Sequence, residues 1–536
     1  MSIQLKPFAV ALCLAGFAAA PVFAATTDTN PDNAQIQAEL AKLQKEVKSL
    51  KAQVKTSQQV AKKSSKKSST STAGSSTGTS DMQDTLSPEQ VKSLISQERE
   101  YLPFDLDVPG QAFVSTGPYV GVPIQYAGSE LVVNSPSVNT DVQLLSIRKS
   151  IHKQLEAMGG ELFKEPYHSH LLLSGVVEGQ AGYNSHGGSA NLTNIPDPNP
   201  STVQGNMPST SNIDVTNVSL DAFFIGPSDW TLGFVELSYS DSTPSSTDSY
   251  TVSNSNVYVN KAFVTIGNFS QSPFYGTFGQ YYVPFGVYSS VMVSDTLPKL
   301  LARTKERAIE VGFNQQGDSG FYGSTYIFRG DAHTESVSKI NNGGLNLGYQ
   351  FDKGPFSGTL GAGVLANLAD SGGMQAGNGF SSSEEVHNHV PAYDVHALFG
   401  LSEKWTLIME YVIASTNFNP DDMSFNGHGA KPSALDTQLA YSFYILDDKP
   451  SSIAVGYGKS DQALALEIPL TRTSVTFNTS IWRNTLQSLE FRHDKNYAAS
   501  DTANGPGGPG GTCTASACAS TGEADNAVTA QFDYYF

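Results

Sequence analysis

The sequence predicts an all-β protein: a transmembrane antiparallel β-barrel of about 16 strands, with an N-terminal periplasmic coiled-coil helix and a small α-containing extension. The first observation is a series of segments with period-two hydrophobicity that starts near His170. The second is composition, because 15% of the 536 residues are charged, against about 25% in soluble proteins. The third is a regular alternation of short turns with long polar loops, which is typical of membrane barrels.

The strand signal is clearest over residues 434–445, where Leu435 and Leu439 alternate with polar Asp436 and Gln438. Period two places the two sets on opposite faces of a strand, one for lipid and one for the lumen. Sixteen such segments occur, and an even number returns both ends of the barrel to one rim. They lie near residues 169–183, 211–225, 230–241, 255–267, 274–283, 306–315, 321–330, 343–351, 356–368, 390–400, 405–417, 434–445, 451–460, 470–481, 487–496 and 526–536.

The connections between these segments differ in length and composition. Short turns such as 226–229, 352–355 and 402–404 alternate with long polar loops. The long loops lie at about 184–210, 241–254, 369–389, 418–433 and 498–523. Transmembrane barrels carry their short turns on the periplasmic side. We therefore expect a location in the bacterial outer membrane, with both the N-terminus and the C-terminus in the periplasm.

Four segments precede the barrel. An apolar run from Pro7 to Ala20, followed by Val22-Phe23-Ala24, predicts a signal peptide, since the run is shorter than the roughly 20 residues of a membrane anchor. Four-three apolar spacing from Ile36 to Val54 predicts a coiled coil, with a lone marginal helix as the alternative. A Ser/Thr/Lys/Gly-rich stretch then predicts a flexible linker. The expected organisation is a signal peptide over 1–24, a coiled-coil helix over 33–56, a linker over 57–81, a periplasmic or lumen-occluding element over 82–165, and the barrel over 166–536.

The last strand carries an apolar face that ends on a terminal aromatic residue, Phe536. This ending is similar to the signal by which the barrel-assembly machinery recognises its clients. Closure by this strand has a physical cause, because an open sheet edge leaves backbone groups without hydrogen-bond partners in lipid.

Cysteine use and charge exclude several classes of function. Cys513 and Cys518 lie in a Gly/Ser/Thr-rich stretch and predict a disulfide, whereas two cysteines alone make at most half of a zinc site. The formal charge of −18 argues against nucleic acid as a partner. No catalytic motif occurs at a strand-to-helix junction, so we expect neither an enzyme nor a cofactor.

Ligand contacts are expected on the lumen face of the strands. A barrel of sixteen strands leaves an aqueous lumen, and charges on opposing walls can create a transverse field that selects solutes. The alternative is a solvated lumen with paired charges and no specific ligand. The candidate ligand-binding residues are Asp394, His396, Glu410, Asp436, Arg472, Glu490 and Arg492, and Glu310 has the same phase.

A basic segment follows the fifth predicted strand. It carries Lys299, Arg303, Lys305 and Arg307 beside a long loop. Such a cluster attracts either an anionic ligand or a lipopolysaccharide phosphate, and both interpretations stay open here.

Several sequence blocks resemble the LbtU-type siderophore porins. The resembling residues are 262–268, 272–275, 279–280, 283–286, 303–305, 480–485 and 488–494, and the block over 480–494 is the most specific. The resemblance implies an outer-membrane siderophore receptor in iron uptake, with a periplasmic N-terminal extension and a sixteen-strand barrel. It supplies no ligand-contacting residue, and the absence of an obvious large plug domain leaves energy coupling open.

Three functional hypotheses follow. The first is a siderophore or ferric-chelate transporter, the second a general or anion-preferring diffusion porin, and the third a surface adhesin or structural envelope protein. The expected partners are a siderophore or another small solute, outer-membrane lipid and lipopolysaccharide, the barrel-assembly machinery, and further copies of this chain through the coiled coil.

Overall fold

The computed structural model describes Leu145, residues 170–185 and most of residues 210–535. The gaps after residue 210 are 226–227, 229, 241–255, 317–318, 335–338, 354–355, 376–379, 381–385, 403, 447–448, 483–484, 506–517 and 521. Outside the described residues lie the predicted signal peptide, coiled coil and linker, the 82–165 element apart from Leu145, Cys513 and Phe536. No helix among the described residues is long and apolar enough to cross a membrane.

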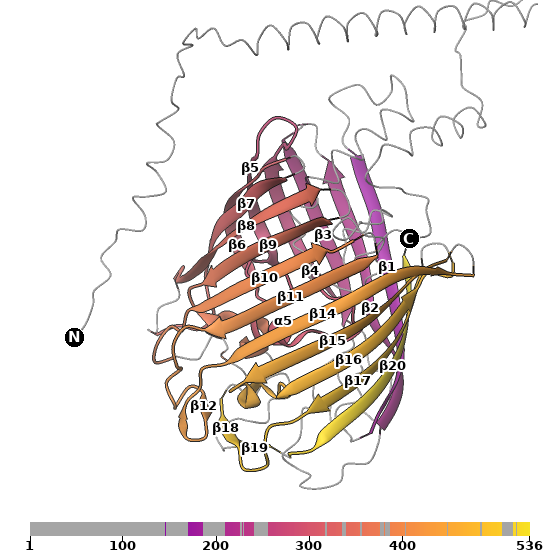
Figure 1. The fold of residues 1–536 in the computed structure, drawn as a ribbon. Coiled ribbons are helices and arrows are strands. Elements are labelled where there is room, and N and C mark those ends of the chain that lie inside the picture. The colour runs from indigo at the N-terminus through magenta and orange to yellow at the C-terminus, as the bar shows by residue number, and fades with distance from the viewer. Residues whose placement is uncertain are drawn as a thin grey trace, which may run out of the picture. The chain divides into compact units, whose positions relative to one another are not determined.

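Sixteen antiparallel strands close into one barrel in chain order (Figure 1). The first eight are β1 His170–Asn184, β2 Thr210–Ile225, β3 Thr231–Ser240, β4 Asn256–Gly267, β5 Phe274–Tyr282, β6 Lys305–Asn314, β7 Ser319–Phe328 and β8 Asn342–Lys353. The others are β9 Phe356–Leu365, β10 Ala392–Gly400, β11 Trp405–Ala414, β14 Ser433–Ile445, β15 Lys449–Asp461, β16 Thr471–Thr479, β17 Thr485–Lys495 and β20 Ala524–Tyr535. The predicted fold class and strand number are confirmed, and each predicted strand overlaps an observed one.

The last strand closes the barrel by pairing on both of its edges. β20 pairs with β17 from Thr485↔Tyr534 to Lys495↔Ala524, and with β1 from Val176↔Tyr535 to Asn184↔Ala527. Closure therefore leaves no open sheet edge to be solvated in lipid, as the hydrocarbon core of a membrane demands.

The two faces of each strand differ in polarity, as β15 illustrates. Its outward residues Val455 and Tyr457 are 54% and 46% exposed, whereas Ala454 and Ser460 on the other face are buried. Lipid-facing residues of membrane barrels are apolar while the interior is polar. The observed alternation is therefore that of a barrel of the membrane type.

The two rims of the barrel carry different connections. The short-turn rim holds 226–230, 268–273, 315–318, 354–355, 401–404, 446–448 and 480–484, together with the beginning of β1 and the end of β20. The long-loop rim holds the remaining connections. Aromatic rings gather at the short-turn rim, including Phe351 with Phe356 at 5.0 Å and Trp405 with Tyr441 at 4.8 Å between ring centroids. Such aromatic belts mark a membrane–water boundary.

Two of the long polar loops contain short strands in their described residues. Loops 415–432 and 496–523 contribute a four-stranded sheet in the order β13 His428–Gly429, β12 Ser424–Phe425, β18 Thr502–Asn504 and β19 Cys518–Ala519. The phenol oxygen of Tyr497 lies 2.7 Å from Ser460 Oγ and accepts from the Ala463 amide at 3.0 Å. We call the described residues of loops 415–432, 462–470 and 496–523 the loop cap. The Cys513–Cys518 disulfide stays a prediction, with Cys518 placed in β19.

One of the contacts between the loop cap and loop 366–391 is made by His387. His387 Nδ1 lies 2.7 Å from Asp422 Oδ1, and the His387 amide donates to Asp422 Oδ2 at 2.9 Å. The hydrogen bond to Asp422, followed by the charge of that carboxylate, raises the pKa of His387. A raised folded-state pKa means that the contact stabilises the loops below the ordinary His value of about 6.5 and weakens as pH rises through the raised value.

We expect a nuclear magnetic resonance titration of the folded protein to place the His387 pKa above that of a histidine in a model peptide. In Asp422→Asn the pKa of His387 should return toward the peptide value. An unchanged His387 pKa in Asp422→Asn would show that Asp422 is not the cause.

Candidate functional site

The lumen contains a chain segment that enters it from the long-loop rim. Residues 283–304, here called the lumen segment, leave β5 and turn inward before β6 begins. The Val283 amide donates to the Thr304 carbonyl at 3.0 Å, which holds the two ends of the segment together. Phe285 and Val291 are fully buried. The sequence interpretation missed this insertion, because period-two analysis reports only where the strands end.

Two local features shape the lumen segment. Gly286 has a φ of +76°, and a Cβ there would lie 2.7 Å from Glu410 Oε1, so only glycine fits this turn. Helix α5, Leu297–Ala302, begins at Thr296, whose side chain accepts from the Lys299 amide, and has Pro298 in its first turn. A Ser/Thr cap followed by proline is a usual helix start.

Two glutamates of the barrel wall accept hydrogen bonds from backbone amides of the lumen segment. Glu410 on β11 accepts from Val287 at 2.8 Å and from Tyr288 at 2.6 Å. Irregular backbone inside a barrel has no strand neighbour, so its buried amides need side-chain acceptors. A carboxylate with two oxygens can satisfy two adjacent amides at once.

Glu490 on β17 repeats this arrangement further along the segment. Its carboxylate accepts from the Val293 amide at 2.7 Å and from the Ser294 amide at 3.2 Å. Thr476 on β16 donates its hydroxyl to the same carboxylate at 2.8 Å. Glu490 is 2% exposed and Glu410 is 4% exposed, so both contacts are shielded from water.

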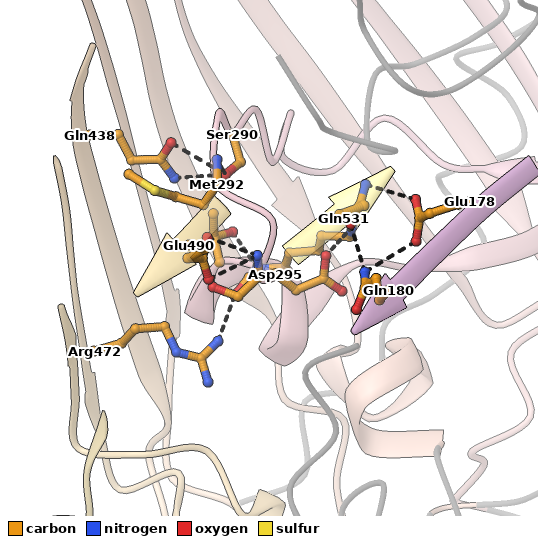
Figure 2. Close-up of polar contacts among 12 residues, drawn as sticks. Glu178, Gln180, Ser290, Met292, Asp295, Gln438, Arg472, Glu490 and Gln531 are labelled. Atoms are coloured by element: carbon orange, nitrogen blue, oxygen red, sulfur yellow. Dashed lines mark hydrogen bonds and ion pairs between the residues drawn. The ribbon is translucent and has the colours of Figure 1, made fainter. Parts of the chain in front are cut away.

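Neutral and cationic side chains of the barrel wall bind the same segment (Figure 2). Gln438 Oε1 accepts from the Val291 amide at 2.9 Å, and Asn478 donates to the Val291 carbonyl at 2.9 Å. Arg472 Nη1 donates to the Asp295 carbonyl at 2.8 Å (Figure 2). The wall from β11 to β17 therefore fastens the lumen segment along its length.

Arg472 also belongs to a buried ion-pair network. Its guanidinium binds Asp494 through two hydrogen bonds of 2.8 Å each, and Arg492 Nε lies 3.1 Å from the same carboxylate. Bidentate arginine–carboxylate contacts fix geometry as well as charge. This network holds the Arg472 side chain where it reaches Asp295.

Asp394 and His396 lie on β10, next to Glu410 on β11. His396 Nδ1 lies 2.6 Å from Asp394 Oδ1, and His396 Nε2 lies 3.0 Å from the Tyr322 hydroxyl. Among the described residues, Asp394, His396 and Glu410 form the group whose potential metal-ligand atoms lie within 4.8 Å of one another. Both ring nitrogens and the Glu410 oxygens are already engaged, so the arrangement is better suited to supporting the lumen segment than to holding an ion.

Close packing around His396 gives a test of this support. A Cβ at Gly361 would lie 2.3 Å from His396 Nε2, whereas at Gly363, the next inward residue of β9, the nearest atom would be 3.3 Å away. We expect Gly361→Ala to destabilise the folded barrel by about 1–3 kcal/mol through overpacking. Gly363→Ala should have a smaller effect. Denaturant midpoints of the folded, heat-modifiable barrel would measure both, and equal midpoints would contradict this packing.

Loop 366–391 holds the end of the lumen segment. The Gly372 amide donates to the Arg303 carbonyl at 2.8 Å, and the Ser371 hydroxyl donates to the Leu301 carbonyl at 2.8 Å. Asp370 accepts from the Ala332 amide at 2.8 Å, and burial raises its pKa to about 6. Loop 366–391 thus positions α5 from the side of the long-loop rim, while the strands hold the rest of the lumen segment.

The seam between the first and last strands carries a second polar cluster. Gln180 donates to Gln531 at 2.6 Å, and Gln531 donates to Glu178 at 3.2 Å and to Asp533 at 2.9 Å (Figure 2). The pairs Glu178↔Asp533 and Gln180↔Gln531 face each other in the β1–β20 register. The sequence interpretation missed these residues. The hydrophobic pattern of a single strand does not predict its register with a strand at the other end of the chain.

All seven predicted ligand-binding residues lie on the lumen side, though not as one cluster. Glu410, Glu490 and Arg472 contact the lumen segment, and Asp394 and His396 stand beside Glu410. Asp436 accepts from Gln438 at 2.8 Å, and Arg492 pairs with Asp494. Ligand binding by these residues stays a prediction. Gln438 and Asn478 were not among the candidates, although they share the lumen phase of their strands.

Curated proteins of two bacterial species are similar to this chain. A UPF0422 protein of Coxiella burnetii is 35% identical over 426 residues, covering 79% of this chain and 84% of its own length. The UPF0422 protein lpl2888 of Legionella pneumophila is 35% identical over 439 residues, covering 79% and 76%. No family model matches the chain.

Solved structures share the general fold. The outer membrane channel DcaP of Acinetobacter baumannii has a TM-score of 0.43 and 16% identity, covering 69% of this chain and 97% of that chain. An anion-selective porin from Comamonas acidovorans has a TM-score of 0.44 and 12% identity, covering 69% and 100%. At these values the likeness concerns the barrel alone.

Proposed function

This chain belongs to the UPF0422 protein family, and we propose that it is an outer-membrane channel through which small solutes pass. The observation that carries the proposal is the lumen segment. Buried Glu410 and Glu490 hold a long segment inside the barrel. A barrel with a purely structural role does not require such a segment, whereas a channel requires a defined constriction. The long-loop rim faces the outside in this proposal, with both ends of the barrel in the periplasm.

The solute that we propose is a ferric siderophore. The resemblance to siderophore porins supports this choice, because its blocks fall on the elements that build the constriction. The blocks between residues 262 and 286 include half of β4, four residues of β5 and the start of the lumen segment, and residues 303–305 include its end. The block over 480–494 includes Glu490, which binds the middle of the segment.

A general diffusion porin is the second candidate, and the charge of the lumen favours a cation preference for it. The buried charged side chains of the described strands are mostly carboxylates, and the anion-preferring form is disfavoured for this reason. The carboxylates are Asp221, Glu236, Glu310, Asp394, Glu410, Asp436, Glu490, Asp494 and Asp533, and the buried cations of these strands are Lys261 and Arg472.

Conductance and uptake of the same chain separate the two candidates. In planar bilayers, we expect a ferric siderophore to block reversibly the ion current through the full-length protein. The iron-free chelator and a sugar of similar size should not block it. Cells that lack the protein should take up less labelled ferric siderophore under iron limitation, with normal sugar permeation. A large current that no ferric chelate blocks would leave the diffusion porin as the function. No current and no uptake defect would leave a surface adhesin or structural role.

A further inference from the structure

Three cations project from the outer surface of the barrel where β6 and β7 meet the long-loop rim. Lys305 and Arg307 have the same phase on β6 as Ile309, which is 49% exposed on the outer face. Arg329 follows β7 with the phase of outward Ile327, and its side chain is 55% exposed. Cations are unusual on a surface that otherwise contacts lipid, so we expect this cluster to bind an anionic partner.

The register brings the two arginines together. The β6–β7 ladder ends at Ala308↔Phe328, and the next residues along the two strands are Arg307 and Arg329. Neighbouring strands are about 4.8 Å apart, and like charges directly opposite each other destabilise a sheet. An anion that binds both guanidinium groups would remove this repulsion.

The protein's own groups neutralise these cations incompletely. Lys305 Nζ donates to the amide oxygen of Asn260 at 2.8 Å, and Arg307 Nε donates to the amide oxygen of Gln280 at 3.3 Å. Both of these acceptors are uncharged. Arg329 pairs with the carboxylate of Asp331, which lies 3.5 Å away and is itself 44% exposed. Exposed pairs of this kind contribute little energy.

Apolar side chains lie directly below the cations on the same face. Val311 is 58% exposed, Ile327 is 50% exposed, and Phe278 on neighbouring β5 is 67% exposed. A ligand that fits both parts of this surface carries an anionic group at the membrane boundary and hydrocarbon chains that extend into the membrane. Arginine binds phosphate through paired hydrogen bonds, so Arg307 and Arg329 suit a phosphate group.

We propose that Lys305, Arg307 and Arg329 form a binding site for the phosphate group of a glycolipid in the outer leaflet, with its acyl chains along Ile309 and Ile327. The inference rests on the outer-membrane placement in the proposed function, with the long-loop rim outward, and is independent of which solute the channel carries. The site lies outside the barrel, away from the lumen segment.

The chain offers a matched control on the same rim. Lys459 on β15 and Lys495 on β17 are also exposed on the outer face, but Thr471 on β16 lies between them in the register. Two strand spacings separate the backbones of these residues by about 10 Å, twice the separation of Arg307 and Arg329. A double substitution at either site removes the same charge from the same face.

The test is binding of lipid A to the full-length protein, refolded in detergent without lipopolysaccharide and measured by native mass spectrometry. We expect bisphosphorylated lipid A to bind wild type and K459Q/K495Q alike, and R307Q/R329Q at least about tenfold more weakly, because charge-assisted hydrogen bonds are lost. Dephosphorylated lipid A should bind all three proteins weakly.

Heat-modifiable mobility must be normal in each variant, and unchanged bilayer conductance of R307Q/R329Q keeps this test separate from that of the channel. Equal affinity of wild type and R307Q/R329Q would overturn the proposal. Equal weakening in both variants would overturn it as well, since general surface charge would then account for binding. Equal binding of dephosphorylated lipid A would show that the hydrocarbon alone is recognised.

Discussion

Replacing Glu490 by alanine is expected to release the middle of the lumen segment from the barrel wall. The change leaves the buried amides of Val293 and Ser294 without their acceptor. Each buried amide that loses its partner costs about 1–3 kcal/mol, and this exceeds the value of most single surface contacts. The segment should therefore move in the lumen, and single-channel current should become larger or noisier.

Hydrogen exchange provides the local measurement. In Glu490→Ala, exchange protection should fall at Val293 and Ser294 and persist at Val287 and Tyr288, which Glu410 holds. Glu410→Ala should give the reverse pattern, so each variant controls for the other. Loss of protection across the whole barrel in either variant would indicate global destabilisation and contradict the local role. The isosteric Glu490→Gln keeps one acceptor oxygen and should fall between wild type and alanine.

Replacing Phe536 by serine is expected to prevent assembly of most of the protein into the outer membrane. Phe536 lies outside the described residues, directly after β20, which pairs with both β1 and β17. If this strand is not recognised and inserted, two sheet edges stay open in lipid, where each unpaired backbone group costs several kcal/mol. The effect should therefore be close to all-or-none.

The measurement is the fraction of heat-modifiable protein in purified outer membranes. Phe536→Tyr keeps a terminal aromatic ring and should assemble normally, whereas Phe536→Ser should be degraded or remain in the periplasm. Normal assembly of Phe536→Ser would show that the aromatic terminus is dispensable. In that case the pairing of β20 alone would account for closure.

The barrel wall was predictable because membrane burial acts on every strand in the same way. The alternation of apolar and polar residues, as in Leu435, Asp436 and Gln438, indicates which face of a strand contacts lipid. Short turns indicate where the chain reverses direction. Both signals are local in sequence, so the sixteen strands and the lumen phase of residues such as Glu410 and Arg472 followed from them.

The loop cap shows where local patterns fail. Loops 415–432 and 496–523 are polar and rich in small residues, yet residues such as Phe425 and Ala503 pair across about eighty positions of chain. Such pairing requires both loops to lie at the same rim of the barrel. Periodicity within either loop does not predict this pairing. The same reasoning applies to Glu178 and Asp533, which meet only because the barrel closes.

The sequence alone determined that this protein is a membrane barrel, which strands form it and which side chains face inward, because each follows from period-two burial. Only the tertiary structure decided that residues 283–304 lie in the lumen and that Glu410, Gln438 and Glu490 hold them there. The physical reason is that a buried irregular segment must find acceptors for its amides. Those acceptors come from strands more than a hundred residues away, which are brought near only when the barrel closes.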